Sequence, residues 1–410
     1  MERVTKTIRA ACPRSDYRST LAGTDVLEVV YDVYVPRGGP LGEPYGASEA
    51  MGLPVVNIVF LHGTGMTRSI WEWYVEYLEA ETRRGRWPFR LGKLITVDQV
   101  NHGDSGVVNR GKLGTTFHWV DGARDVVKIC ELELFDQEQQ QQQQQQAYNS
   151  YNVLVGHSMG GHQALACGVL SPNMFQLIIG MEPVVKMVHK SGKGRPIESD
   201  IRLGPESIGS TMSLNYFKAI SRKVEDTFDD KEGYIEFMRK RSFWTNADER
   251  ILERFCEAEY YLEEVKQPQS PASVRVRVKT KTAKDQHLIS YMCLYPYTVW
   301  LMNNLQWIKT PVVCLVGAKS RWCPPENYQL FQERIHNYQR ITIPDVDHLM
   351  NIENPDTIAP LLLSHIRNGV SNANRDQLHT NKDDFGPLYT KFKAESIGRS
   401  SQAHAKLSKL

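Results

Sequence analysis

The chain has 410 residues, of which 41% are hydrophobic and 23% charged, so it is long enough for one large globular domain with an insertion or for two domains. The formal net charge of +2 and the lack of a basic block with interleaved aromatic residues argue against a nucleic-acid partner. No run approaches the roughly 18 apolar residues of a transmembrane segment, and the N-terminal residues contain no apolar core of a signal peptide.

Seven cysteines are scattered along the chain without a pairing pattern, mostly in apolar segments. No C-x-x-C pair and no cluster of histidine and cysteine indicates a metal site, so we expect neither a metal nor an organic cofactor. This cysteine usage favours a reducing, intracellular compartment.

The first quarter of the chain predicts one early strand and one buried strand. Residues 1–20 are polar and are expected to be irregular, whereas every second residue from Asp25 to Val35 is apolar, which predicts an antiparallel strand or hairpin. Glycine and proline residues mark 37–54 as a loop. The nearly unbroken apolar run Val55–Leu61 is typical of a buried parallel strand, and the glycine-rich turn His62 to Gly65 follows it.

The segment after this turn continues the alternation of helix and strand. We expect a helix over Ser69–Thr82, a strand over Leu94–Val97 and a helix over Asp121–Phe135. The intervening loop contains His102 and Asp104, which could suggest a catalytic pair. We instead interpret Asp104 and Ser105 as residues that stabilise a turn by local hydrogen bonds.

Eight consecutive glutamines, Gln139–Gln146, follow that helix. A tract this polar cannot fill a core, so we interpret it as a surface insertion between helix and strand.

The segment from Tyr151 to Cys167 carries the strongest chemical signal. An apolar run leads into Gly156, Ser158 stands between Gly156 and Gly160, and a helical pattern begins at once. G-x-S-x-G alone would occur by chance in about one chain of this length in seven, so the flanking strand and helix decide its meaning. Strand, sharp turn and helix with a serine at the apex is typical of the nucleophile elbow of α/β-hydrolases.

An oxyanion hole is expected beside this elbow. The fold builds it from the N–H behind the nucleophile and an N–H of the glycine-rich turn after an early strand. We therefore predict that the backbone N–H groups of Met159 and Thr64 stabilise the oxyanion of a tetrahedral intermediate.

The alternation of predicted strands and helices stops after Glu182 and resumes at about residue 311. Phe175–Met181 predicts a buried strand that ends at Glu182, but 186–307 is charged, aromatic and helical in places, as at Tyr234–Arg241 and Glu249–Glu264. We interpret 186–307 as a mainly helical cap, with one short alternation at Val274–Val278. The sheet resumes afterwards with a strand over 311–317, a helix over 326–336, a strand over 340–343 and a closing helix over 355–366.

A serine hydroxyl needs a base to become nucleophilic, and this fold uses the chain order serine, acid, histidine. His348 follows the last predicted strand, which is where that histidine belongs, whereas His157 and His162 lie too close to Ser158 along the elbow.

The acid is harder to identify, because its usual place after the strand ending at Gly317 is occupied by Ser320. A known variant places the acid one strand earlier, and Glu182 stands there, so Glu182 is the predicted acid. Asp345 and Asp347 would need a local loop geometry that brings them beside His348. Glu326, the remaining alternative, begins a predicted helix, where the helix dipole favours an acidic residue whether or not it is catalytic.

The expected architecture is an α/β-hydrolase fold, a mostly parallel central sheet flanked by helices, with the cap inserted into it. The expected parts are a first core segment 1–185, the cap 186–307, a second core segment 308–370 and a polar tail 371–410. The tail ends in Ser408-Lys409-Leu410, the tripeptide read as a peroxisomal targeting signal, which predicts an import receptor as a partner.

Several segments resemble those of the peroxisomal lipases of budding yeasts, serine carboxylester hydrolases of the α/β-hydrolase superfamily. These segments are Thr24–Glu28, Tyr31–Tyr34, Phe60–Met66, Asp98–Ser105, Asp121–Asp125, Gly156–Gly161, Glu182–Val185, Trp322–Pro325 and the C-terminal Ser-Lys-Leu. The resemblance covers roughly Ser19 to Arg367 and is weakest in the cap. It implies a carboxylester hydrolase of the peroxisomal matrix that acts on lipid esters, with Ser158 as nucleophile and His348 as base.

Ser158 excludes the epoxide hydrolases and haloalkane dehalogenases of this fold, which need an aspartate at the elbow. Three alternatives stay open: an acyl-CoA thioesterase, an acyl hydrolase of secondary metabolism, and a catalytically silent peroxisomal binding protein.

Overall fold

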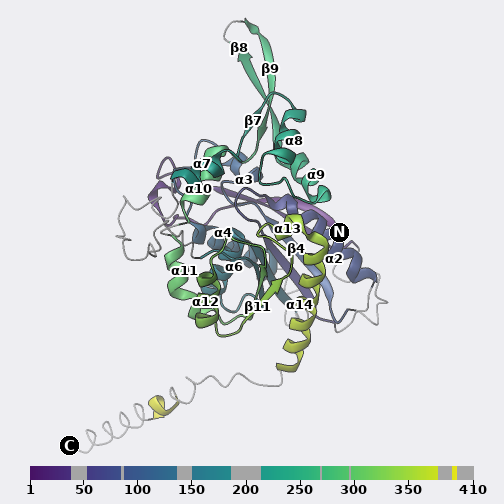
Figure 1. The fold of residues 1–410 in the computed structure, drawn as a ribbon. Helices are drawn as coiled ribbons and strands as arrows, with labels where there is room; N and C mark the ends of the chain where they lie inside the picture. Colours follow the sequence, from purple (N-terminus) through teal and green to yellow (C-terminus); the bar gives the residue numbers. More distant parts are fainter. Residues whose placement is uncertain are drawn as a thin grey trace, which may run out of the picture. The chain divides into compact units, whose positions relative to one another are not determined.

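The computed structural model describes residues 1–37, 53–84, 87–135, 150–185, 214–267, 270–294, 297–376 and 390–394 (Figure 1). The chain divides into two units, Met1–Arg367 and Asn368–Leu410. The described part of the second unit comprises the end of helix α14 (Pro355–Asp376) and a helical turn at 390–394. The glutamine run and the Ser-Lys-Leu tripeptide lie outside the described residues.

An eight-stranded sheet in the order β1-β2-β4-β3-β5-β6-β10-β11 forms the centre of the first unit. Its strands are β1 (Glu2–Arg9), β2 (Glu28–Val35), β3 (Val55–Leu61), β4 (Arg90–Val97), β5 (Ser150–His157), β6 (Leu177–Met181), β10 (Val312–Gly317) and β11 (Tyr338–Ile343). Only β2 runs antiparallel to its neighbours, and every other pair is parallel. The prediction of a mostly parallel sheet flanked by helices is confirmed.

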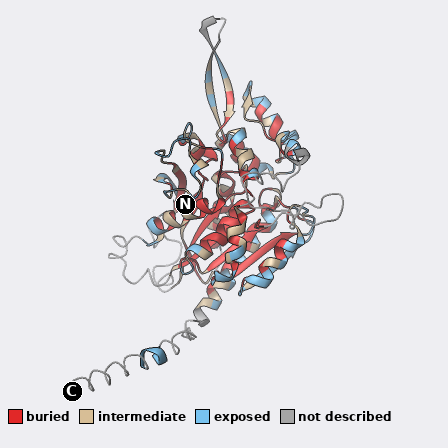
Figure 2. Cartoon of the chain, turned by 90° about the vertical axis from the view of Figure 1, so that its left-hand side faces the viewer, coloured by how far each residue is buried: buried red, intermediate tan, exposed pale blue. Residues whose placement is uncertain are grey.

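Helices cover the strands of the first unit, which Figure 2 shows as mainly buried. The described helices of the core are η1 (Tyr17–Ser19), η2 (Arg68–Trp71), α2 (Glu72–Arg84), α3 (Gly103–Val108), α4 (Trp119–Phe135), α6 (Met159–Leu170), α12 (Pro325–Arg334), α13 (Met350–Glu353) and α14. Side chains of α4, α6 and α12 share one apolar cluster with alternate residues of the strands, such as Val59 and Leu61. Phe60, whose side chain points to the opposite face, stacks on Trp71.

Strand β1 corrects the expectation that residues 1–20 are irregular. All eight residues of β1 pair antiparallel with β2, from Glu2 opposite Val35 to Arg9 opposite Glu28. The strand lies at the edge of the sheet, and its residues are mostly exposed. An edge strand with so little buried surface carries no apolar alternation, so hydrophobic periodicity does not reveal it.

The segment 186–307, which the sequence analysis interprets as a cap and which we call the insertion below, contains helices and a small antiparallel sheet in its described part. Its elements are α7 (Leu214–Ser221), β7 (Thr227–Phe228), α8 (Lys231–Lys240), α9 (Glu249–Ala258), β8 (Tyr260–Gln267), β9 (Ser270–Thr280), α10 (Lys284–Met292), α11 (Thr298–Asn304) and η6 (Leu305–Trp307). The helix expected over Glu249–Glu264 ends at Ala258, because Tyr260 begins β8 and pairs with Thr280 of β9. Strands β8 and β9 form a hairpin that projects from the body of the first unit (Figure 1).

Candidate active site

Ser158 occupies a strained turn between β5 and α6. Its φ of 54° and ψ of −111° are unusual for a residue with a side chain, and such strain is typical of a nucleophile elbow. Gly156 and Gly160 make this turn possible. A Cβ on Gly156 would lie 2.2 Å from the carbonyl oxygen of Gly160, and a Cβ on Gly160 would lie 2.4 Å from that of Leu61.

The structure brings Ser158, His348 and Glu182 into one hydrogen-bonded chain. Ser158 Oγ lies 3.2 Å from His348 Nε2, and His348 Nδ1 lies 2.6 Å from Glu182 Oε2. All three residues are buried. They come from three loops that meet at the carboxyl ends of neighbouring parallel strands, where this class of fold places its ligands.

Glu182 accepts two further hydrogen bonds. The N–H of Gly317 donates to Oε1 at 2.9 Å, and the hydroxyl of Ser320 donates to Oε2 at 2.6 Å. Ser320 is the residue that stands at the usual position of the acid, and its hydroxyl contacts the carboxylate of the preceding strand. These donors satisfy a carboxylate that has no exposed surface.

The other candidate acids do not contact the imidazole of His348. Asp345 is 87% exposed and pairs with Lys319 at 3.1 Å. Asp347 accepts a hydrogen bond from the backbone N–H of His348 at 2.7 Å, not from its ring. Glu326 is exposed in the first turn of α12.

Thr64 and Met159 lie beside the elbow. The side-chain oxygen of Thr64 is 3.6 Å from Met159 Sδ, and a Cβ on Gly63 would lie 3.3 Å from Ser158 Cβ. Met159 is the first residue of α6 and so has no intrahelical acceptor for its N–H. The N–H of Thr64 likewise has no acceptor within the described residues.

Two buried histidines hold the glycine-rich turn. His62 donates through Nδ1 to the carbonyl of Gly63 and accepts from the N–H of Gln99 through Nε2. His102 accepts from the N–H of Gly65 at 3.1 Å. Burial lowers the pKa of both rings, which therefore stay neutral and act as structural groups.

The carboxylate of Asp104 forms ion pairs with the distant residues Arg68 and Lys281, and not the local turn hydrogen bonds that the sequence led us to expect. Arg68 binds the carboxylates of Asp32, Asp98 and Asp104, and this network ties the 98–105 loop to η2.

His157 has a role that sequence reasoning missed. Its Nε2–H donates to the backbone carbonyl of His348 at 2.8 Å, so it holds the loop that carries the catalytic candidate. Burial lowers the pKa of His157 well below its usual range, which keeps the ring neutral. No sequence pattern distinguishes this contact, because it joins residues 191 positions apart.

Trp322 also contacts His348. The two rings stack at a centroid distance of 5.2 Å and an interplanar angle of 22°. In the sequence, Trp322–Pro325 carries only the resemblance to the yeast lipases, whereas the stacking places Trp322 beside the imidazole.

The described residues contain one group with metal-ligand chemistry, Glu182, Cys323 and His348. A metal ion there would have to replace the hydrogen bond between Glu182 and His348. We therefore interpret the group as part of the hydrogen-bonded chain.

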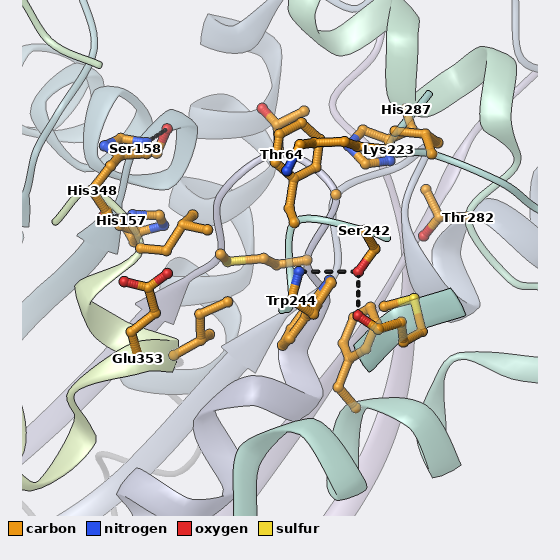
Figure 3. A pocket seen from close by; sticks show the side chains of 18 of the residues that line it. Thr64, His157, Ser158, Lys223, Ser242, Trp244, Thr282, His287, His348 and Glu353 are labelled. Atoms are coloured by element: carbon orange, nitrogen blue, oxygen red, sulfur yellow. Dashed lines mark hydrogen bonds between the residues drawn. The ribbon is translucent and has the colours of Figure 1, made fainter. Parts of the chain in front are cut away.

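A cavity of about 540 Å³ opens beside Ser158 and His348 (Figure 3). The insertion supplies much of its wall, and its apolar lining includes Met66, Phe237, Met238, Phe243, Trp244, Phe255, Trp322, Leu349 and Ile352. Ser158 and His348 thus lie at the wall of a cavity large enough for a small organic molecule.

The chain is 38% identical over 372 residues to the peroxisomal membrane protein LPX1 of Saccharomyces cerevisiae, with 89% of this chain and 87% of that protein covered. The crystal structure of the peroxisomal α/β-hydrolase Lpx1 of Saccharomyces cerevisiae superimposes with a TM-score of 0.73 at 34% identity, covering 98% of each chain. The resemblance to this yeast protein is confirmed.

A more distant relative is the type I acyl-CoA thioesterase mpaH of Penicillium brevicompactum. It is 22% identical over 273 residues, which are 65% of this chain and 52% of that protein.

Among the described residues, no helix is both long enough and apolar enough to cross a membrane.

The family model for the alpha/beta hydrolase family matches residues 58–361. With this match and the relationship to the yeast protein, the chain belongs to the alpha/beta hydrolase family.

Proposed function

We propose that this protein is a serine hydrolase that cleaves carboxylic esters of lipids. One observation carries the proposal: Ser158, His348 and Glu182 form a single hydrogen-bonded chain at the wall of an apolar cavity. Nucleophile, base and orienting acid at such distances are the arrangement that acyl transfer requires.

In the proposed mechanism, His348 Nε2 takes the proton of Ser158 as the hydroxyl attacks the ester carbonyl. The oxyanion accepts hydrogen bonds from the N–H groups of Thr64 and Met159, and Glu182 stabilises the imidazolium. His348 then protonates the leaving alcohol, which leaves an acyl-Ser158 ester. Water, deprotonated by His348, hydrolyses that ester in the second half of the reaction.

The lipid substrate follows from the apolar wall of the cavity, to which Phe243, Trp244 and Phe255 of the insertion contribute. The insertion would thus act as the cap that forms the acyl pocket and controls entry. We further propose that the protein works in the peroxisomal matrix, imported through its terminal Ser408-Lys409-Leu410. This location is supported by that sequence and by the peroxisomal names of the yeast relative.

An acyl-CoA thioesterase is the second candidate, because the cavity wall also carries the cationic residues Lys223, Lys319 and Arg321. Cations beside an apolar pocket suit the phosphates of a CoA thioester. The similarity to the Penicillium acyl-CoA thioesterase supports the same candidate.

Labelling with a fluorophosphonate, followed by peptide mapping, tests the proposal. We expect one adduct on Ser158, abolished in Ser158→Ala. Parallel assays on p-nitrophenyl esters, triacylglycerol and acyl-CoA then separate the ester and thioester candidates. A wild-type protein that takes up no label and hydrolyses none of the three would be the silent binding protein instead.

A further inference from the structure

Trp322, in the loop that follows β10, lies against the candidate base. Its indole ring is nearly parallel to the imidazole of His348, with the ring centroids 5.2 Å apart and an interplanar angle of 22°. The proposed acyl transfer does not use this ring, although Trp322 lines the same cavity as Ser158. A side chain that contacts the face of the base can act on the position of the base and on its charge.

The hydrogen bonds of His348 reach only the edge of its ring. Nε2 lies 3.2 Å from Ser158 Oγ, and Nδ1 lies 2.6 Å from Glu182 Oε2. Both contacts act in the plane of the imidazole, so they resist a tilt out of that plane only weakly. A contact on the face of the ring restricts this tilt, and the stacked indole supplies one.

Stacking also favours the charged form of the imidazole. In the proposed reaction His348 gains a proton as Ser158 attacks, and the face of an indole attracts a cation that lies within about 6 Å of the ring centroid. The positive charge develops in the transition state and is absent while the ester is merely bound. The attraction should therefore raise kcat more than it lowers KM.

Other titratable side chains lie near the imidazole, and their contacts do not depend on the indole. Burial lowers the pKa of His157, which keeps that ring neutral, and raises the pKa of the Cys323 thiol well above its usual range. Glu182 binds the imidazole, and Asp347 binds the backbone N–H of the same histidine. Replacing the indole therefore removes the stack and leaves these contacts in place.

Trp322 is held by the core and by the insertion. Its backbone N–H donates to Ser320 Oγ at 3.4 Å, and that hydroxyl donates in turn to Glu182. From the insertion, Tyr291 of α10 meets the indole at a centroid distance of 6.0 Å and an angle of 64°. Tyr291 belongs to a small apolar cluster against which the indole packs. The insertion thus reaches the imidazole through two aromatic side chains.

We propose that Trp322 is a positioning residue for His348: its indole holds the imidazole in place and stabilises the imidazolium, and Tyr291 of the insertion holds the indole. This role rests on the proposed function and deepens it, because it gives the insertion a part in activating Ser158 as well as in forming the pocket. An indole that only lined the acyl pocket would matter for long acyl chains alone, and this difference separates the two roles.

Hydrolysis of p-nitrophenyl acetate and p-nitrophenyl octanoate by Trp322→Leu is the first test. An acetyl group is too short to need the apolar wall, so a loss that appears with acetate acts on the base. We expect kcat to fall about tenfold for both esters, with KM for acetate within about threefold of wild type. Trp322→Phe keeps an aromatic face and should retain at least about a third of the wild-type kcat.

Trp307→Leu is the matched control for this substitution. Trp307 is an exposed residue of η6 and does not line the cavity, so kcat and KM should stay at their wild-type values for both esters.

The pH dependence of kcat/KM tests the effect on charge. In Trp322→Leu, the acid limb of the profile should move to lower pH by about half a unit, because the imidazolium loses a stabilising neighbour. A tryptophan with a purely structural role would lower the profile without moving it. An acid limb that stays in place or moves to higher pH would overturn the stabilisation of the imidazolium.

A double variant tests the link to the insertion. Tyr291→Leu should lower kcat for acetate about threefold, and Tyr291→Leu/Trp322→Leu should be no slower than Trp322→Leu, because Tyr291 acts through the indole. Losses that multiply in the double variant would overturn this link.

The outcomes separate the positioning role from the reaction itself. A Trp322→Leu variant with kcat within about twofold of wild type for both esters, or with a loss for octanoate alone, overturns the positioning role and leaves the hydrolase proposal intact. A wild-type protein that hydrolyses neither ester overturns the proposed function and this role with it. Should Trp322→Leu fail to fold, Tyr291→Leu decides: a lower kcat for acetate supports the role, and an unchanged kcat overturns it.

Discussion

The hydroxyl of Ser320 donates a 2.6 Å hydrogen bond to Glu182 Oε2, the same oxygen that lies 2.6 Å from His348 Nδ1. Glu182 follows β6 and Ser320 follows β10, and these strands are parallel neighbours in register. Residues that follow the two strands therefore reach the same point beside His348. An acid on either strand can serve one histidine, and here the carboxylate lies on the earlier strand while a hydroxyl supports it from the later one.

Replacing Glu182 by glutamine should lower kcat by about 10⁴-fold, as the same change of acid to amide does in another catalytic triad. The amide keeps the shape but carries no charge to stabilise the imidazolium. Measurement of p-nitrophenyl ester hydrolysis checks this, with Glu326→Gln as the exposed control that should retain wild-type kcat. A Glu182→Gln rate within tenfold of wild type would assign the acid to another residue.

The acid should be movable between the two strands. Ser320→Asp alone places two carboxylates in contact, and their repulsion favours protonation of one, so activity should fall. The double variant Glu182→Ala/Ser320→Asp should have a kcat at least tenfold higher than that of Glu182→Ala alone. A double variant no faster than Glu182→Ala would show that the later strand cannot present an acid to His348. Both rates are compared at saturating substrate.

His157→Phe should lower kcat about tenfold with little change in KM. The phenyl ring preserves packing but leaves the carbonyl of His348 without its donor, a loss of about 1–3 kcal/mol, and it loosens the loop that positions the imidazole. His162→Phe is the matched control, since His162 is also buried and donates to a carbonyl, that of Val184 at 2.8 Å. Equal kcat values for the two variants would refute a positioning role for His157.

Local pattern was sufficient to predict the central strands and the elbow. β3, β5, β6 and β10 are buried on both faces, so their sequences are mostly apolar without alternation. The tight turn at Ser158 requires two glycines, which the sequence shows directly. β1 is an exposed edge strand, whose pairing depends on β2 rather than on its own residues.

The surroundings of the candidate site could not be predicted in the same way. The hydrogen bond from Ser320, the contact of His157 with the His348 carbonyl and the stacking of Trp322 each depend on which strands become neighbours. Tyr260 likewise begins a strand because β9 is available to pair with it, although the preceding helical pattern runs on in the sequence.

The buried carboxyl of Glu259 should make stability depend on pH. Its pKa is raised from 4.5 to about 8, so between these values the folded protein holds a proton that the unfolded chain releases. The stabilisation that Glu259 contributes should therefore be greatest below about pH 4.5, fall as the pH rises towards 8, and level off above it. At about 1.36 kcal/mol per pKa unit, the total loss is at most about 5 kcal/mol.

Urea unfolding of wild type and Glu259→Gln at pH 5 and pH 8.5 isolates this effect, because all other titrating groups are common to both proteins. The free energy of unfolding of wild type should fall relative to that of Glu259→Gln between the two pH values. A constant difference between the two proteins would mean that Glu259 is already ionised at neutral pH and that its burial does not hold the proton.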